Sequence, residues 1–182
     1  EGCPYWYVFP VLKRLVPADA VFAGDIGCNM IAGLSPHNMQ DTLFSMGASL
    51  GVGHGVKKVT NQKVVSIIGD GTFFHSGISG LINVVYNKSN PLVVILDNRI
   101  TAMTGHQPNP GMGKTVMGQD TEELKIEEIV KACGVKNVKL LDPINMQEFE
   151  ATIKDFLTKE EVSVIICKRI CALLAKRQEA KQ

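Results

Sequence analysis

Two apolar segments of this chain each end in acidic or amide side chains, and this restricts the fold more than any other feature. Residues 63–68 run into a Gly-Asp-Gly turn centred on Asp70, and residues 91–96 run into Asp97-Asn98, with 25 residues between turn and pair. That interval is long enough for a helix joining two parallel strands. The carboxyl ends of both strands then meet at one edge of the sheet, where open α/β folds bind ligands.

The polar residues at this edge suit a metal ion and a phosphate group. Asp70 and Asn98 each offer an oxygen, the ligand that Mg²⁺ prefers. A helix starting just after Gly71 would point its free N–H groups at a phosphate, and Gly69 and Gly71 would let the backbone come close. A lone Gly-Asp-Gly is also an ordinary strand-to-helix turn, so the second strand is needed for this interpretation.

The rest of the chain alternates strand-like and helix-like segments, which predicts an α/β fold: an open, mostly parallel sheet with helices on both faces. The length of the chain leads us to expect a single domain over 1–182. The expected strands are 20–23, 64–68, 92–96, 135–141 and 162–167, and the expected helices are 5–15, 43–59, 77–86, 126–133 and 146–157.

Three segments have unusual composition. The predicted helix 43–59 contains glycines at 47, 51, 53 and 55, for which close packing against the sheet is the main explanation. Residues 101–121 form a long Gly- and Pro-containing loop, either a lid over the phosphate or a surface excursion. Residues 176–182 are expected to be a frayed polar tail.

Composition limits the partners and the compartment. The net charge is +1, from 19 basic and 18 acidic residues, which disfavours nucleic acid and anionic membranes. No apolar run approaches the ~20 residues that span a bilayer, and no signal peptide is recognisable at the start, so we expect a cytoplasmic protein. Five cysteines favour free thiols or metal ligands over a disulfide framework.

Four motifs narrow the family. Together they resemble the thiamine diphosphate-dependent 2-oxoacid:ferredoxin oxidoreductases, most closely the indolepyruvate type. The motifs are Gly24-Asp25-Ile26-Gly27-Cys28, Met46-Gly47-Ala48-Ser49, Thr72-Phe73-Phe74-His75-Ser76-Gly77 and the segment from Asp97 to Pro108.

This resemblance implies the thiamine diphosphate-binding domain of a large (alpha) subunit. The expected activity is oxidative decarboxylation of an aryl 2-oxoacid to acyl-CoA, with ferredoxin accepting the electrons. The expected partners are a pyrimidine-binding domain, a gamma-type (beta) subunit, ferredoxin, coenzyme A and the 2-oxoacid, in an oligomer. The glutamate that activates the cofactor lies on the pyrimidine-binding domain in this family, so the isolated chain is expected to be inactive.

The resemblance also assigns site residues. Asp70, Asn98 and the backbone carbonyl of Ile100 would bind Mg²⁺, although the family often has Asn-Asn where this chain has Asp97-Asn98. The cofactor-binding residues would be Asp25, Gly27, Cys28, Gly47, Gly69, Gly71, Thr72, Thr104 and Gly105.

Histidines are the default acid–base candidates near such a site. His75 and His106 lie within the cofactor-flanking motifs and are the catalytic candidates, whereas His37 and His54 are expected to be structural. Met46, Phe73 and Phe74 could line an aromatic substrate pocket, but apolar residues at element ends are more often core.

The cysteines leave two alternatives open. By resemblance, Cys3, Cys28 and Cys171 match three of the four thiolates of an iron–sulfur cluster. Alternatively, Cys28 contacts the cofactor and Cys171 is a packed or frayed thiol. Cys133 and Cys167 are expected to be buried hydrophobes.

Two other functions are compatible with the same sequence motifs. A non-oxidative thiamine diphosphate-dependent 2-oxoacid decarboxylase would share the Mg²⁺ motif but need no electron relay. A non-catalytic phosphate-binding module would share only the phosphate-binding turn.

Overall fold

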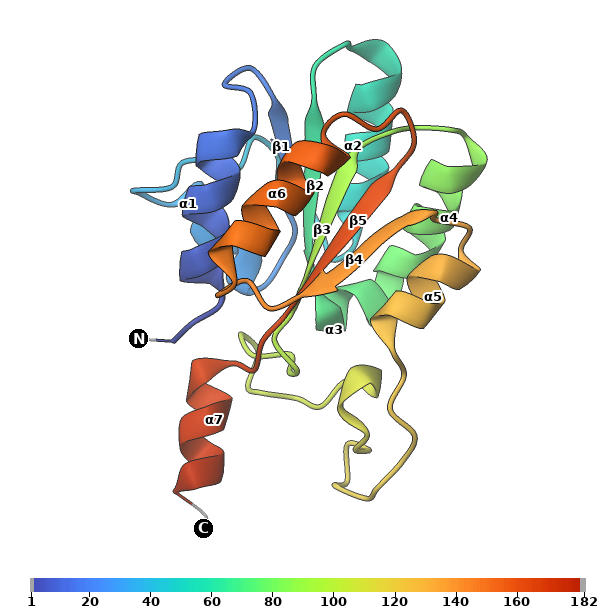
Figure 1. Ribbon diagram of the computed structural model, residues 1–182. Helices are drawn as coiled ribbons and strands as arrows, with labels where there is room; N and C mark the ends of the chain where they lie inside the picture. The colour runs from blue at the N-terminus through green and yellow to red at the C-terminus, as the bar shows by residue number, and fades with distance from the viewer. Residues whose placement is uncertain (1, 181–182) are drawn as a thin grey trace.

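A computed structural model describes residues 2–180 as one five-stranded sheet with helices on both sides (Figure 1). All strand pairs are parallel, and the strand order is β1-β2-β3-β5-β4. The strands are β1 (Val21–Ala23), β2 (Val64–Gly69), β3 (Leu92–Asp97), β4 (Asn137–Leu141) and β5 (Ser163–Lys168). The α/β fold class predicted from the sequence is confirmed, and each strand lies within two residues of its predicted bounds.

Helices cover the sheet because alternate strand residues point to opposite faces. One face packs against α1 (Tyr5–Leu15), the 3₁₀ helix η1 (Cys28–Gly33) and α6 (Met146–Phe156). The other face packs against α2 (Ala48–Val59), α4 (Ile78–Tyr86) and α5 (Ile126–Ala132). Each face therefore has its own apolar core, as buried parallel sheets require.

The register of the two central strands determines where the polar residues meet. Gly69 at the end of β2 is aligned with Leu96 on β3. Asp70 and Asp97, the next residues along each strand direction, therefore emerge side by side at the carboxyl edge, which is the lower edge of the sheet in Figure 1.

The predicted helix 43–59 starts too early, since α2 begins at Ala48. Gly47 has φ 83°, a left-handed conformation that cannot continue a helix backwards. The buried carboxylate of Asp25 accepts N–H bonds from Gly47 and Ser49, at 2.9 and 3.1 Å, so a residue after β1 caps this helix.

The predicted helix 77–86 starts too late. The chain turns into helix at Asp70, through α3 (Asp70–Thr72) and a π-helical turn η2 (Phe73–Gly77), and only then continues as α4. Gly77 lies inside this path because it packs closely on Ile68, where a Cβ would come within 2.8 Å. Gly77 is therefore a packing position within the helical segment and does not mark its start.

Beyond β3 the chain forms the predicted long loop, interrupted by the 3₁₀ helix η3 (Pro110–Met112) and two isolated bridges. The predicted polar tail is wrong for most of its length, because α7 (Ala172–Glu179) is helical. Lys181 and Gln182 lie outside the described residues. The helix has no buried residue and lies beyond the carboxyl edge of the sheet (Figure 1).

The glycines of α2 serve different purposes. A Cβ on Gly53 would lie 2.1 Å from the Ser66 hydroxyl, and one on Gly47 would lie 2.3 Å from the Ser76 hydroxyl. At Gly51 and Gly55, which are exposed, a Cβ would have no neighbour within 4 Å. Close packing therefore explains Gly47 and Gly53 and is wrong for the other two.

Among residues 2–180, no helix is long and apolar enough to cross a membrane.

Two matched substitutions in α2 test this packing. Gly55→Ala should raise the free energy of unfolding by about 0.5–1 kcal/mol, because alanine loses less backbone entropy in a helix. Gly53→Ala should lower it by about 1–3 kcal/mol, because Ser66 is buried and its hydroxyl is bonded to the Ser49 carbonyl. Urea denaturation measures both changes, and equal effects would contradict the contact with Ser66.

Candidate functional site

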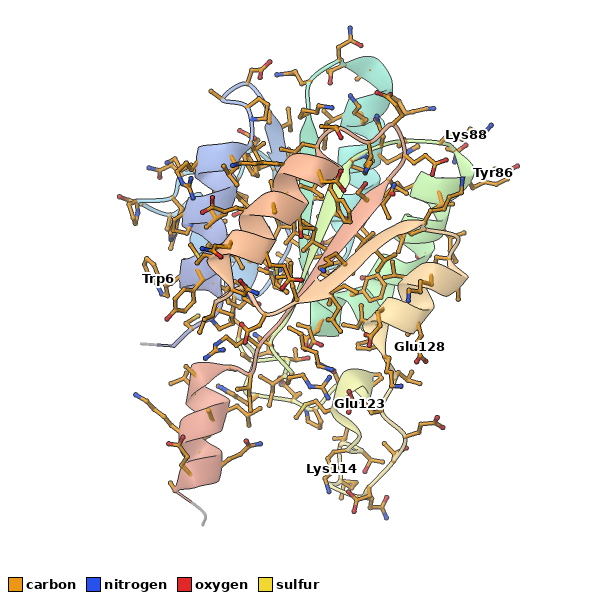
Figure 2. All side chains as sticks on the ribbon, in the orientation of Figure 1. Trp6, Tyr86, Lys88, Lys114, Glu123 and Glu128 are labelled. Atoms are coloured by element: carbon orange, nitrogen blue, oxygen red, sulfur yellow. The ribbon has the colours of Figure 1, made fainter. Side chains whose placement is uncertain are left out.

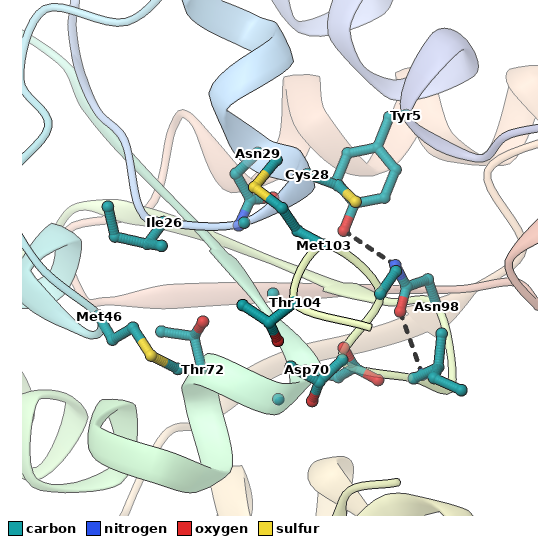
Figure 3. Close-up of a pocket in the computed structure, with 16 residues that line it drawn as sticks. Tyr5, Ile26, Cys28, Asn29, Met46, Asp70, Thr72, Asn98, Met103 and Thr104 are labelled. Atoms are coloured by element: carbon teal, nitrogen blue, oxygen red, sulfur yellow. Dashed lines mark hydrogen bonds between the residues drawn. The ribbon is translucent and has the colours of Figure 1, made fainter. Parts of the chain in front are cut away.

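A small cavity of about 80 Å³ lies at the carboxyl edge, between the ends of β1, β2 and β3 (Figure 3). Nine residues predicted from the sequence line it: Gly27, Cys28, Gly69, Asp70, Gly71, Thr72, Asn98, Ile100 and Thr104. The fold therefore brings together segments that are up to 77 residues apart, from Gly27 to Thr104.

Asp70 contributes a buried carboxyl group to this cavity. It is buried, with 3% of its surface exposed. Burial, together with the nearby carboxyl of Asp97, raises the pKa of Asp70 to about 7. The partly compensating contact is the amide of Asn109, whose Nδ2 donates to Asp70 Oδ2 at 2.9 Å. A buried carboxyl pair of this kind is poised to accept a cation.

Asp97 is held by cationic side chains on its other side. Arg99 lies 3.6 Å from the Asp97 carboxylate and 3.0 Å from Glu123, and Lys168 lies 3.4 Å from Glu123. Burial still raises the pKa of Asp97, although Arg99 and Lys168 oppose it. Glu123, at the end of the long loop (Figure 2), thus ties that loop to the ends of β3 and β5.

Asn98 is positioned by contacts on both sides of its amide. Its Oδ1 accepts the Ile100 N–H at 3.2 Å, and its Nδ2 donates to the Tyr5 hydroxyl at 3.3 Å (Figure 3). An amide oxygen has a second lone pair, so Oδ1 keeps the capacity to bind a metal ion. Burial raises the pKa of Tyr5 well above its usual range, so its hydroxyl stays protonated.

The loop after Asn98 folds back over the turn that carries Asp70. Asn109, buried between two prolines, bonds to Asp70 and also accepts the Gly111 N–H at 3.0 Å. Gly71 lets Thr101 approach, since a Cβ there would lie 2.3 Å from the Thr101 hydroxyl. These contacts favour the lid interpretation of the loop over a surface excursion.

Asp25 and Gly47 lie outside the residues that line the cavity. All the hydrogen bonds recorded for the Asp25 carboxylate come from backbone N–H groups, including Ile26 at 2.8 Å. Gly27, two residues after Asp25, does line the cavity. Its φ is 101°, a conformation that is strained for any residue with a side chain. Asp25 therefore shapes the site through the backbone, and its direct contact with a cofactor stays a prediction.

The two catalytic candidates also lie outside the cavity lining. His75 is exposed on the π-helical turn. His106 is half-buried, has φ 62°, and has no hydrogen-bond partner for Nε2 within the described chain. Gly105, beside it, also lies apart from the cavity. Acid–base roles for these histidines stay predictions.

Sequence reasoning missed three polar residues of the site: Tyr5, Asn29 and Asn109. Tyr5 and Asn29 line the cavity, and Asn109 contacts Asp70. Tyr5 has the position of a core residue in an amphipathic helix. Asn29 directly follows Cys28, which is the residue of that motif predicted to contact the cofactor or a cluster. The one available signal was Asn109, a helix-capping residue directly before a proline.

The residues present fit a hard cation bound together with phosphate. Mg²⁺ is usually held by one or two carboxylates and by phosphate oxygens, with waters completing the octahedron. Asp70, Asn98 Oδ1 and the Ile100 carbonyl supply such a partial set of oxygens. No three His, Cys, Asp or Glu side chains of residues 2–180 group as a metal cage. The fit is therefore to a metal shared with a ligand.

The raised pKa of Asp70 predicts a pH-dependent stability effect in the metal-free protein. The pKa rises from 3.8 unfolded to about 7 folded, so Asp70 contributes stability that is lost as the pH rises through 7. Asp70→Asn should therefore stabilise the protein at pH 8, by on the order of 3 kcal/mol, and have little effect at pH 4. Denaturant unfolding in excess chelator measures this difference, and an effect of equal size at both pH values would refute the assignment.

Comparison with known proteins identifies the family. Residues 25–167 match the family described as "Thiamine pyrophosphate enzyme, C-terminal TPP binding domain". The match begins directly after β1, covers β2, β3, β4 and nearly all of β5, and includes Asp70 and Asn98.

Individual relatives agree with this. The chain is 43% identical to indolepyruvate oxidoreductase subunit IorA of Methanothermobacter thermautotrophicus, over 94% of this chain and 29% of that protein. It is 34% identical to sulfopyruvate decarboxylase subunit beta of Methanocaldococcus jannaschii, over 70% of this chain and 62% of that protein. The chain thus spans less than a third of the length of the IorA relative.

A solved structure has the same fold. The 2-oxoglutarate:ferredoxin oxidoreductase of Magnetococcus marinus superposes with a TM-score of 0.80 at 18% identity, covering 93% of this chain and 62% of that one. The sequence-based prediction of the family is confirmed: the chain belongs to the thiamine pyrophosphate (thiamine diphosphate) enzymes, and corresponds to their C-terminal cofactor-binding domain.

Proposed function

We propose that this chain is the cofactor-binding part of an oxidoreductase that converts aryl 2-oxoacids of the indolepyruvate type to acyl-CoA, with ferredoxin as the electron acceptor. The observation that carries the proposal is the buried pair of Asp70 and Asn98 at adjacent strand ends, in a chain 43% identical to an indolepyruvate oxidoreductase subunit.

The described residues would act mainly by binding and positioning. Thiamine diphosphate, when bound, supplies the nucleophilic carbon that attacks a 2-oxoacid and the electron sink for loss of carbon dioxide. Asp70, Asn98 and the Ile100 carbonyl would hold Mg²⁺ against its diphosphate. Arg99 contacts Asp97 and Asn109 contacts Asp70, so both would keep the two carboxyl groups in place.

The geometry also supports a site completed by another part of the enzyme. Pockets for whole cofactors usually measure ~300–1,000 Å³, whereas this cavity measures about 80 Å³. Met46 and Met103, which line it, are 36% and 52% exposed, and nearby in sequence Phe44 is 69% exposed. Exposed apolar side chains beside a binding site mark a contact surface. We propose a pyrimidine-binding domain as the covering part, with a gamma-type (beta) subunit, ferredoxin and coenzyme A as further partners in an oligomer.

An iron–sulfur cluster is a further proposal for the complete enzyme. By resemblance, Cys3, Cys28 and Cys171 would supply three of its ligands, although no three such side chains of residues 2–180 group as a metal site in this structure. The Cys171 N–H also bonds to the Asn98 carbonyl at 2.9 Å, which places this thiol close to the metal-binding residues. Three thiols fall short of the usual four cluster ligands, so a fourth would come from outside the described residues.

A non-oxidative decarboxylase is the second candidate. The observation that favours it is the 34% identity to a sulfopyruvate decarboxylase subunit. Both candidates use the same Mg²⁺ and cofactor site. They differ in whether electrons leave to ferredoxin.

Calorimetry of cofactor binding tests the metal assignment. Thiamine diphosphate should bind only with a divalent ion, and Asp70→Ala should abolish binding because the carboxylate that holds the ion is lost. Asn98→Ala should weaken binding by about tenfold, since a neutral oxygen holds a dication less strongly. Asp155→Ala, at an exposed position of α6, is the matched control. Unchanged affinity in Asp70→Ala, or in excess chelator, would refute the proposal.

A turnover assay tests the proposal of an incomplete site. The 182-residue chain with cofactor and Mg²⁺ should not convert pyruvate, 2-oxoglutarate or indolepyruvate, whereas the complete assembly should reduce ferredoxin, fastest with indolepyruvate. Turnover by the chain alone would show that the activating groups lie within it. Carbon dioxide release by the assembly without ferredoxin reduction would favour the decarboxylase.

A further inference from the structure

We propose that Asn29 is a phosphate-binding residue of the cofactor site, which donates its amide N–H groups to the diphosphate and is assisted by the hydroxyl of Tyr5. This inference rests on the proposed function, because it assigns a residue to the same site.

The first observation is a buried amide without partners. Asn29 is 1% exposed, and neither its Oδ1 nor its Nδ2 has a hydrogen-bond partner within the described chain. Leaving a buried polar group unpaired is strongly unfavourable, and such groups in native proteins are usually paired with a ligand or water. Asn29 also lines the cavity, where Figure 3 shows it beside Cys28. The unpaired amide therefore faces a site where a ligand would bind.

The second observation is where the amide lies. A Cβ built on Gly69 would lie 3.4 Å from Asn29 Nδ2 and 4.0 Å from the Tyr5 hydroxyl. Gly69 directly precedes Asp70, so both groups lie over the turn that would carry the metal ion. In Figure 3, Tyr5 and Asn29 lie above the cavity and Asp70 below it. A diphosphate held through a metal on Asp70 would lie between them.

The third observation is the kind of hydrogen bond these groups can make. The Asn29 amide offers two N–H donors. The Tyr5 hydroxyl already accepts a bond from Asn98 Nδ2, and no contact recorded for residues 2–180 uses its own proton. Donors are what phosphate oxygens require, and neutral donors suit a phosphate whose charge Mg²⁺ already offsets. The backbone of Asn29 is already fixed before a ligand binds, because Asn29 belongs to the 3₁₀ helix η1, which follows Gly27.

Binding measurements with two probes separate the possible contacts. Magnesium pyrophosphate reports on the phosphate site alone, and thiamine diphosphate with Mg²⁺ reports on the whole cofactor. For Asn29→Leu, of similar volume, we expect the affinity for both probes to fall by about tenfold to a hundredfold, the range for a hydrogen bond to a charged group. Asn29→Asp should weaken both further, because a carboxylate replaces the donors. Asn83→Asp, on the exposed face of α4, is the matched control and should bind as the wild type does.

Unfolding in the absence of ligand separates binding from structure. Asn29→Leu should leave the melting temperature unchanged or raise it, since the amide makes no internal bond. A lowered melting temperature for Asn29→Leu and Asn29→Asp alike would overturn the proposal, because the amide would then be a structural group.

The binding outcomes are equally decisive. Wild-type affinity for magnesium pyrophosphate in Asn29→Leu, with or without weaker thiamine diphosphate binding, would overturn the phosphate assignment. Failure of the wild type to bind either probe would instead overturn the proposed function and this inference with it. Tyr5→Phe should give a smaller loss with both probes, since it removes one donor and leaves the ring in place.

Discussion

The structure of the site depends on two carboxyl groups buried at the end of neighbouring parallel strands. The β2–β3 register brings Asp70 and Asp97 together in a place with little access to water. Burial raises the pKa of both carboxyl groups, and the charge of Asp97 raises the pKa of Asp70 further. The guanidinium of Arg99 lies beside the Asp97 carboxylate, whereas the side chain that bonds to Asp70 is the neutral amide of Asn109. The missing positive charge is what a metal ion would supply.

The surrounding structure fixes the groups around this pair through backbone geometry. Asp25 bonds the start of α2 to the segment after β1, so that Gly27 and the residues that follow it are held at the cavity. Gly71 allows Thr101 to approach the turn, and Asn109 returns the long loop to Asp70. The Asn29 amide, in contrast, has no hydrogen-bond partner among the described residues. Functional sites commonly keep such unfavourable features because ligand binding compensates for them.

The size of the cavity and the length of the relatives support the proposal that other parts complete the site. The chain spans 29% of the IorA relative and contains a complete α/β sheet with its own two cores. Its binding cavity is nevertheless small, its rim is apolar and exposed, and α7 has no buried residue. A well-packed sheet beside a small, exposed site is consistent with the proposal that another domain covers the cofactor.

The sequence was sufficient to predict the parallel sheet, its five strands and the presence of Asp70 and Asn98 at the same edge. Those features follow from apolar runs and turn residues, which act over a few neighbours along the chain. Three features emerge only from the folded chain: α2 begins at Ala48, the helix after β2 begins at Asp70, and 172–179 is helical. The tertiary structure also decided that Tyr5 and Asn29 belong to the site, because their roles arise from contacts with Asn98 and Gly69, residues 93 and 40 positions away in the chain. Local patterns carry no information about such contacts, since burial and hydrogen-bond pairing are set only when distant segments pack together.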